Sequence, residues 1–245
     1  EREKVRLEQI VQERTREVVE QKDKIEKQRD EIAKKNRDIT DSIEYASKIQ
    51  NAVLPSSDIT KQILPEHFIF FKPRDIVSGD FYWVNQKNDL IIIIAADCTG
   101  HGVPGAFMSM LGVSLLNEIV NKHEVTKANL ILNELREEVK RTLRQTGRAG
   151  EAKDGMDISL CLLDMKQMQM QYAGAYNPLY LFRDSKLHQY KADRMPIGIY
   201  IKEKPTFTNQ LIDLQRGDTF YIFTDGYPDQ FGGENGRKFK TRQLK

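Results

Sequence analysis

The first 54 residues contain neither glycine nor proline, and this absence constrains the chain more than any other feature of its sequence. Lysine, arginine, glutamate and glutamine dominate the segment, and all four are good helix formers. Opposite charges recur at the stabilising i, i+4 spacing, as in Glu20 with Lys24 and Glu31 with Lys35. The sequence therefore predicts one long, solvated helix over residues 1–54.

Within this helix an apolar residue recurs at every seventh position, the repeat that winds helices into a left-handed coiled coil. The repeat consists of Val11, Val18, Ile25, Ile32, Ile39, Ala46 and Val53. The other half of the seam is polar until Ile43, with Thr15, Lys22, Arg29 and Asn36, so the pairing should be weak. We interpret residues 1–54 as a coiled-coil signalling helix and linker that forms a parallel homodimer and passes a signal onward by shifting. A single solvated helix that acts as a spacer is the alternative.

Pro55 ends the helix, because proline cannot donate to the helical hydrogen-bond ladder. Beyond it the pattern becomes that of short strands and two helices. We expect strands at 68–71, 80–84, 90–96, 157–164, 168–174, 178–183, 186–191 and 218–224, and helices at roughly 104–121 and 127–146. Strands this close in sequence pair as hairpins, which makes the sheets mainly antiparallel. The pattern predicts an α+β domain over residues 55–245.

Three aspartates stand beside glycines at strand ends or turns: Ser78-Gly79-Asp80, Asp97-Cys98-Thr99-Gly100-His101-Gly102 and Thr224-Asp225-Gly226. A carboxylate after a buried strand lies at the rim of the sheet, and glycine lets a ligand approach the backbone closely. Carboxylates and carbonyls are the ligands of hard cations such as Mg²⁺ and Mn²⁺. Each motif alone is more often a plain turn, but their joint occurrence indicates a metal site.

The same segments resemble a known family. The strings from Pro73 to Trp83, from Ala96 to Ala106, from Ala175 to Pro178 and from Phe223 to Gly226 are similar to motifs of the PPM-type phosphatases of the type 2C superfamily. They are most similar to the bacterial branch typified by the stage II sporulation phosphatase E. The segment from Ala46 to Pro55 is similar to the linker helix of that branch. The resemblance implies a four-layer α-β-β-α sandwich of two mainly antiparallel sheets flanked by helices.

The resemblance also implies an enzyme, a metal-dependent serine/threonine phosphoprotein phosphatase. In such an enzyme Asp97 bridges two divalent cations, Mn²⁺ or Mg²⁺, while Asp80, Asp225 and the backbone carbonyl of Cys98 complete the ligand shells. A water activated by the cations then attacks the phosphorus of a phosphoserine or phosphothreonine. The implied substrate is a phosphoprotein that acts as a regulatory switch, for example an anti-sigma-factor antagonist.

Other polar residues in these motifs have two readings each. Arg74 is a candidate phosphate-binding residue, because a guanidinium matches phosphate oxygens, but a surface salt bridge explains it equally well. His101 is a candidate proton donor to the leaving oxygen, against a structural imidazole in a glycine turn. For Asp154 and Asp157 we favour a turn and strand cap over a role in the site.

The family pattern ends with one further aspartate-bearing strand, which this sequence lacks before Lys245, so we expect the C-terminal strand to be missing. That gap keeps a second hypothesis open, a non-catalytic signalling scaffold with the phosphatase fold. Cys98 and Cys161 form no disulfide or zinc pattern, which favours the cytoplasm. Because the first helix is already under way at Glu1, one alternative is that this segment is the cytosolic part of a larger, membrane-anchored sensor. A net charge of +2 gives no reason to expect nucleic acid. No stretch approaches the roughly 20 apolar residues that cross a bilayer, so we expect no direct membrane contact.

Overall fold

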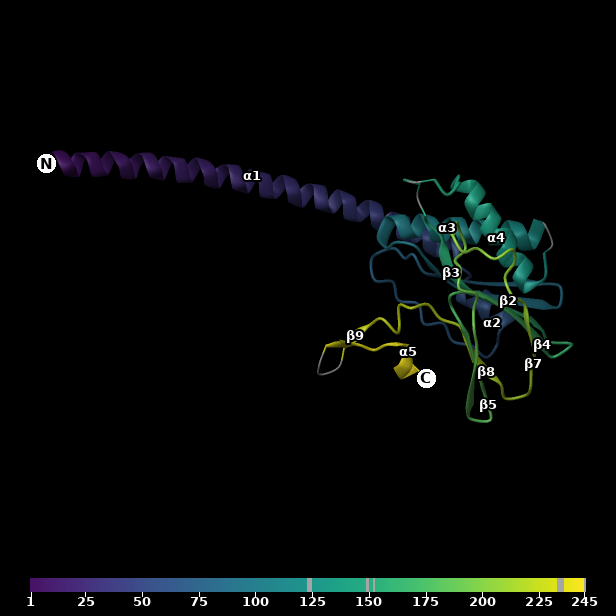
Figure 1. The fold of residues 1–245 in the computed structure, drawn as a ribbon. Helices are drawn as coiled ribbons and strands as arrows, with labels where there is room; N and C mark the ends of the chain where they lie inside the picture. The colour runs from purple at the N-terminus through teal and green to yellow at the C-terminus, as the bar shows by residue number, and fades with distance from the viewer. Residues whose placement is uncertain (123–124, 149, 152, 233–235, 245) are drawn as a thin grey trace. The chain divides into compact units, whose positions relative to one another are not determined.

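The computed structural model describes residues 1–245 except 123–124, 149, 152, 233–235 and 245 (Figure 1). The chain divides into two compact units, Glu1–Ala46 and Ser47–Lys245. Helix α1 (Arg2–Val53) makes up the first unit, and its last two turns belong to the second. The sequence boundary at 54/55 follows the end of this helix, whereas the compact units meet about two turns earlier.

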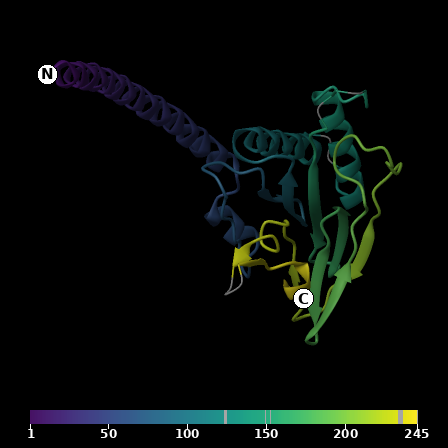
Figure 2. The same ribbon diagram turned by 60° about the vertical axis from the view of Figure 1, so that its left-hand side comes forward.

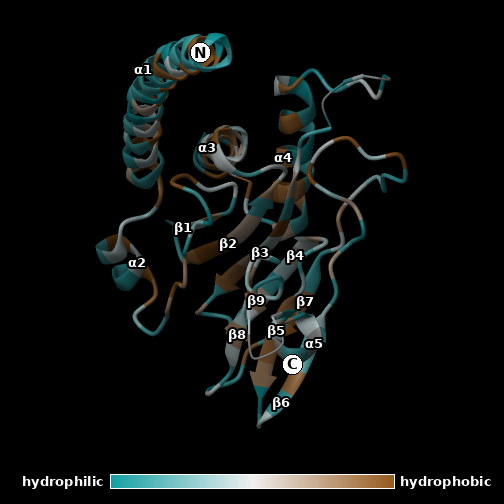
Figure 3. Cartoon of the chain, turned by 90° about the vertical axis from the view of Figure 1, so that its left-hand side faces the viewer, coloured by the Kyte–Doolittle hydropathy of each residue, from teal (hydrophilic) through white to brown (hydrophobic). Residues whose placement is uncertain are grey.

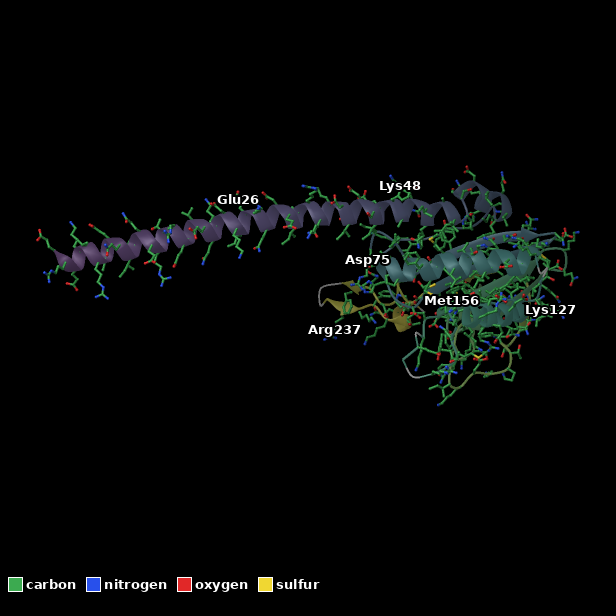
Figure 4. All side chains as sticks on the ribbon, turned by 90° about the horizontal axis from the view of Figure 1, so that it is seen from above. Glu26, Lys48, Asp75, Lys127, Met156 and Arg237 are labelled. Carbon is green, nitrogen blue, oxygen red and sulfur yellow. The ribbon has the colours of Figure 1, made fainter. Side chains whose placement is uncertain are left out.

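The first unit is a single helix whose side chains point outward along its whole length, as Figure 4 shows around Glu26. Ion pairs of Arg14 with Glu17 at 2.8 Å and of Lys35 with Glu31 at 3.2 Å link successive turns. The apolar heptad positions lie open on this chain, with Val18 62% and Ile25 64% exposed. The long N-terminal helix is therefore confirmed, while its pairing with a second helix stays a prediction.

The second unit is built on a five-stranded antiparallel sheet in the order β1-β2-β3-β4-β7. Its strands are β1 (Phe81–Lys87), β2 (Leu90–Cys98), β3 (Met156–Asp164), β4 (Gln169–Ala175) and β7 (Gln210–Asp213). Strand β2 lies near the centre and is apolar on both faces: Ile92 and Ile94 face one core, and Ile91 and Ile93 the other. This explains the unbroken isoleucine run in the sequence.

Two helices cover the first face of this sheet. Helix α3 (Gly102–Asn117), the π-helical turn η1 (Glu118–Lys122) and helix α4 (Ala128–Thr142) bury Leu116, Ile131 and Leu135 against it. The stretch Gly102–Lys122 is long and apolar enough to cross a membrane by length and composition alone, contrary to the sequence expectation. More than half of it is buried inside the domain, so it behaves as a core helix.

A three-stranded sheet in the order β6-β5-β8 packs on the second face. It comprises β5 (Leu179–Arg183), β6 (Lys186–Tyr190) and β8 (Thr219–Tyr221). Leu179 and Leu181 meet Cys161 and Tyr172 in the core between the sheets. Figure 3 shows α3 and α4 above strands β2, β3 and β4 of the larger sheet, with β5, β6 and β8 of the smaller sheet below. The predicted α+β class with mainly antiparallel sheets and flanking helices is confirmed.

The structure corrects the expected elements in several places. Residues 68–71 form no strand, and Phe68 and Phe70 instead lie 71% exposed with their rings against Tyr221 and Tyr227. The second helix and the last expected strand are shorter than predicted. Elements that the sequence missed are helix α2 (Ser57–Ile63), strand β7 and, in the C-terminal segment drawn yellow in Figure 2, β9 (Phe231–Gly232), β10 (Arg237–Lys238) and α5 (Thr241–Leu244).

Candidate active site

Three aspartates lie in a row across the ends of β1, β2 and β3. In the strand register Phe81 is paired with Ala96, which brings Asp80 next to Asp97, and Asp97 is paired directly with Asp157. Directly opposed residues in an antiparallel sheet point to the same face. These carboxylates therefore share the face that the smaller sheet covers.

A fourth carboxylate, Asp225, comes from the chain that follows β8 of the smaller sheet. The Thr224 hydroxyl donates a hydrogen bond of 2.7 Å to Oδ2 of Asp80 and so ties this segment to the start of β1. A Cβ on Gly226 would lie 3.4 Å from the same Asp80 oxygen, which shows that the Gly226 backbone lies close to the Asp80 carboxylate. The four aspartates thus meet where the two sheets end.

The electrostatics link Asp97 to Asp80 and Asp225, and Asp157 to Asp225. Burial, then the charge and hydrogen bond of Asp80, then those of Asp225, raise the pKa of Asp97 to about 9. Burial and the charge of Asp225 raise the pKa of Asp157 to about 6. Carboxylates this close repel one another unless a proton or a cation lies between them. Asp97 is the member that contacts both Asp80 and Asp225.

This donor set matches the chemistry of a hard divalent cation, which prefers carboxylate oxygens. Among the described residues, however, no group of three or more His, Cys, Asp or Glu side chains is already arranged to hold a metal ion. The carboxylate cluster and the lack of such a group are compatible if Asp97 is the shared ligand and the side chains of the other aspartates rotate toward the bound ion. The residues therefore fit Mg²⁺ or Mn²⁺ in chemistry, while the metal roles of Asp80, Asp97, Cys98 and Asp225 stay predictions.

Glycines hold the loop after β2 against the start of β1. A Cβ on Gly79 would lie 2.7 Å from the Gly100 carbonyl oxygen and 3.2 Å from that of Cys98. Gly105 meets the same Gly100 oxygen, where a Cβ would come within 2.6 Å. The Cys98 carbonyl thus borders the site, whereas its thiol is buried with a raised pKa and is unsuited to act as a nucleophile.

The remaining predicted site residues, Arg74 and His101, are exposed. His101 Nδ1 is 3.0 Å from Asp75 Oδ2, and both side chains are largely exposed. Arg74 is exposed, and no ion pair of Arg74 occurs within the described residues. No hydrogen bond between described residues joins Arg74 or His101 to the four carboxylates. Their roles in phosphate binding and proton donation remain predictions.

Sequence reasoning missed two residues of this region. Asp157 was interpreted as a strand cap, but its register opposite Asp97 makes it part of the cluster. Gln50, near the end of α1, is 5% exposed, and its amide binds both backbone groups of Ser78. Nε2 donates to the Ser78 carbonyl at 2.6 Å, and Oε1 accepts from the Ser78 N–H at 3.0 Å. The sequence signal was a glutamine within the linker-like segment, which by itself indicates no contact.

Comparison with known proteins identifies the domain. The family model of stage II sporulation protein E (SpoIIE) matches residues 87–245. The SiaA PP2C domain of Pseudomonas aeruginosa is 34% identical, with a TM-score of 0.75 over 85% of this chain and 80% of that chain.

Two further structures share the fold. The PP2C phosphatase domain with a regulatory fragment of SpoIIE from Bacillus subtilis is 18% identical, with a TM-score of 0.53 over 63% of this chain and 43% of that one. The RsbU and RsbW domains of a Mycobacterium tuberculosis protein are 20% identical, with a TM-score of 0.52 over 65% and 42%. No curated protein sequence matches the chain. On the family match and the SiaA likeness together, the chain belongs to the SpoIIE family of PP2C-type (PPM) phosphatase domains.

Proposed function

We propose that this protein is a metal-dependent phosphatase that removes phosphate from phosphoserine or phosphothreonine in a regulatory switch protein. The observation that carries the proposal is the cluster of Asp80, Asp97, Asp157 and Asp225 at the end of the two sheets. Such a cluster is unfavourable by itself, because burial and mutual repulsion hold a proton on Asp97 up to a pKa of about 9. Cations are the natural counter-charge for it.

Asp97, Asp80, Asp225 and the Cys98 carbonyl would hold two ions, Mn²⁺ or Mg²⁺. When bound, the ions supply positive charge for the phosphate oxygens and lower the pKa of a coordinated water. The protein's own contribution is position: the strand register fixes Asp97 between its neighbours, and the Thr224 hydroxyl orients the Asp80 carboxylate. The glycine contacts keep the loop close to the start of β1.

We further propose a phosphoprotein partner of the anti-sigma-factor-antagonist kind, as the family resemblance implies. The 34% identity to a PP2C domain supports the phosphatase chemistry, whereas the identity of the partner rests on the resemblance alone. We also propose that the protein works in the cytoplasm, since its two cysteines are free and buried.

A parallel homodimer through α1 is the proposed means of regulation. The apolar positions repeated every seven residues are exposed on the single chain and suit a second helix. The last turns of the same helix carry Gln50, whose amide binds the backbone just before Asp80 and also the Ser109 hydroxyl on α3, at 2.7 Å. A shift of the helix end would therefore have to move or break contacts that hold both sides of the candidate site.

Activity is tested with the full chain, MnCl₂, and two substrates, a phosphoserine peptide and p-nitrophenyl phosphate. We expect hydrolysis of both, and a loss of at least about 100-fold in kcat for Asp97→Asn. Asp89→Asn is the matched control, because Asp89 is exposed and forms an ion pair with Lys166 on the surface. Equal rates for wild type and Asp97→Asn would refute the assignment.

Regulation is tested at the seam with Ile25→Asp, and with Gln9→Asp as a control on the face of the helix that points away from the seam. Sedimentation should show that Ile25→Asp shifts the dimer toward monomer, because a charge replaces an apolar contact, while Gln9→Asp leaves it unchanged. Phosphopeptide turnover should change with the dimer. A dimer that dissociates without any change in turnover would exclude this mode of regulation.

The second candidate, a non-catalytic scaffold with the phosphatase fold, is favoured by one observation. No ready-made group of three metal-binding side chains occurs in the described part of the chain. Calorimetric titration with MnCl₂ separates the two candidates. Saturable binding that Asp97→Asn abolishes supports the enzyme, while binding of the phosphopeptide with neither metal binding nor turnover supports the scaffold.

A further inference from the structure

A short segment of chain closes one side of the carboxylate cluster. Residues 193–197 run beside the ends of β3 and β4, through a parallel bridge between Asp193 and Ala175 and an antiparallel bridge between Ile197 and Met156. Met156 is labelled in Figure 4. Its neighbour in β3 is Asp157, and the neighbour of Ala175 is Tyr176. The segment therefore brings Arg194 and Tyr176 to the Asp157 end of the row.

Tyr176 holds an unusual backbone conformation at this place. Its φ of 58° lies in the left-handed region, which bulky residues rarely adopt and which glycine adopts without strain. The conformation is fixed by the Tyr176 N–H, which donates to the Asp193 carbonyl at 2.9 Å. Despite the strain, the ring is 41% exposed, so core packing does not account for a tyrosine here. Strain of this kind is concentrated at functional sites.

A second tyrosine and an arginine accompany it. The rings of Tyr176 and Tyr200 form an edge-to-face pair, with centroids 6.4 Å apart and planes at 84°. The hydroxyl contact with Tyr200, then burial and the charges of Tyr200 and Asp157, raise the pKa of Tyr176 to about 12, and the positive charge of Arg194 acts in the opposite direction. Tyr200, Asp157 and Arg194 are thus all close enough to Tyr176 to affect its hydroxyl. Arg194 is exposed, and in the described chain no carboxylate forms an ion pair with it. Its guanidinium is free to bind an oxyanion.

We propose that Tyr176, Tyr200 and Arg194 form a subsite that binds the substrate polypeptide beside the phosphorylated residue and selects an acidic side chain there. The inference rests on the proposed phosphatase function. The two rings offer an apolar surface next to a planar cation, which suits a chain segment with an acidic residue among apolar ones. The position near Asp157 puts this contact beside a phosphate held at the cluster.

Fluorescence anisotropy tests the charge preference with two labelled phosphoserine peptides, one with glutamates and one with lysines on both sides of the phosphoserine. Wild type should bind the glutamate peptide about fivefold more tightly, the size expected for one exposed ion pair. Arg194→Glu should reverse the preference, and Lys186→Glu, on the distant β5–β6 hairpin, should not. An unchanged preference in Arg194→Glu, or an equal loss for both peptides, would overturn the proposal.

The aromatic contribution is tested with Tyr176→Gly, which removes the ring and accepts the φ of 58° without strain. We expect a melting temperature close to wild type and weaker binding of the glutamate peptide, with p-nitrophenyl phosphate turnover retained. Unchanged peptide affinity in this folded variant would exclude Tyr176 from the subsite.

The phosphatase proposal and the subsite proposal can be refuted independently of each other. Selective peptide binding without hydrolysis of any substrate would remove the phosphatase proposal and leave the subsite. Hydrolysis of both peptides at rates that do not depend on Arg194 would do the reverse.

Discussion

The contact of Gln50 with Ser78 gives the sharpest test of how the end of α1 supports the site. The Gln50 side chain is 5% exposed and forms three hydrogen bonds, two to the backbone of Ser78 and one to the Ser109 hydroxyl. We predict that Gln50→Ala destabilises the second unit and also lowers turnover. Turnover should fall because Ser78 is only two residues from Asp80.

The size of the effect follows from what remains after truncation. The Ser109 hydroxyl still donates to the Ser78 carbonyl at 3.3 Å and to that of Ala106 at 2.9 Å, so these groups keep partners. The Ser78 N–H has no other acceptor among the described residues. Leaving one buried donor unpaired costs about 1–3 kcal/mol, and each further lost bond about 1 kcal/mol. A total of roughly 3 kcal/mol lowers the melting temperature by roughly 6–12 °C in a domain of this size.

Thermal unfolding of the full chain, followed by circular dichroism and by calorimetry, measures this loss. Asn51→Ala is the matched control, since Asn51 is the next residue on the same helix and is exposed. Gln50→Glu separates packing from hydrogen bonding, because it keeps the shape and the acceptor but removes the donor and places a charge in a buried position. If Gln50→Ala melted within about 1 °C of Asn51→Ala, the reasoning from buried hydrogen bonds would be refuted.

Three further predictions concern the site and its support. The folded-state pKa of Asp97, about 9, lies above its ordinary value of 3.8, so the folded protein holds the extra proton and its stability falls as pH rises between them. In EDTA at pH 8, Asp97→Asn should therefore raise the free energy of unfolding by at least about 1 kcal/mol, measured by urea unfolding, although it abolishes activity. Gly79→Ala should lower the melting temperature by roughly 5 °C or more, because its Cβ would lie 2.7 Å from a loop carbonyl oxygen, whereas Gly232→Ala meets nothing within 4 Å. Arg136→Ala, which removes a 3% exposed guanidinium bonded to two carbonyls, should cost about 3 kcal/mol in urea unfolding, against less than about 0.5 kcal/mol for the exposed Arg141→Ala.

Much of the fold was predictable because it depends on local pattern. The isoleucine run predicts strand β2 because that strand is buried on both faces, and the charged N-terminal segment predicts helix α1 because that helix is solvated on all sides. Strand β7 was not predictable, because four residues become a strand only by pairing with β4. Helix α2 was not predicted because Ser56 was interpreted as part of a turn that follows Pro55. In the structure the Ser56 hydroxyl accepts a hydrogen bond from the Ile59 N–H at 3.3 Å and caps the start of a helix.

The residues of the candidate site likewise divide into those that local sequence predicts and those that only the folded structure brings together. Asp80, Asp97 and Asp225 were found because each carries its own glycine, which is a local mark of close approach to the backbone. Asp157 also has a glycine nearby, Gly155, but this segment was interpreted as a turn and strand cap, and the place of Asp157 in the cluster follows from the register between β2 and β3. Gln50 was missed for a related reason: its partner Ser78 is 28 residues away, and only the packed structure brings the two together.

The carboxylate cluster also explains why so much of its surroundings is fixed by specific contacts. Asp80 and Asp225 are 145 residues apart and come from different sheets, yet both act on the protonation of Asp97. Such a cluster pushes its members apart, so the structure must hold them by other means. The Thr224 hydroxyl holds Asp80 from one side, the Gln50 amide fixes the backbone before it, and the loop glycines close the gap. A site assembled against its own repulsion in this way gains the most from bound cations, and stability and activity should therefore respond in opposite directions to removal of the central carboxylate.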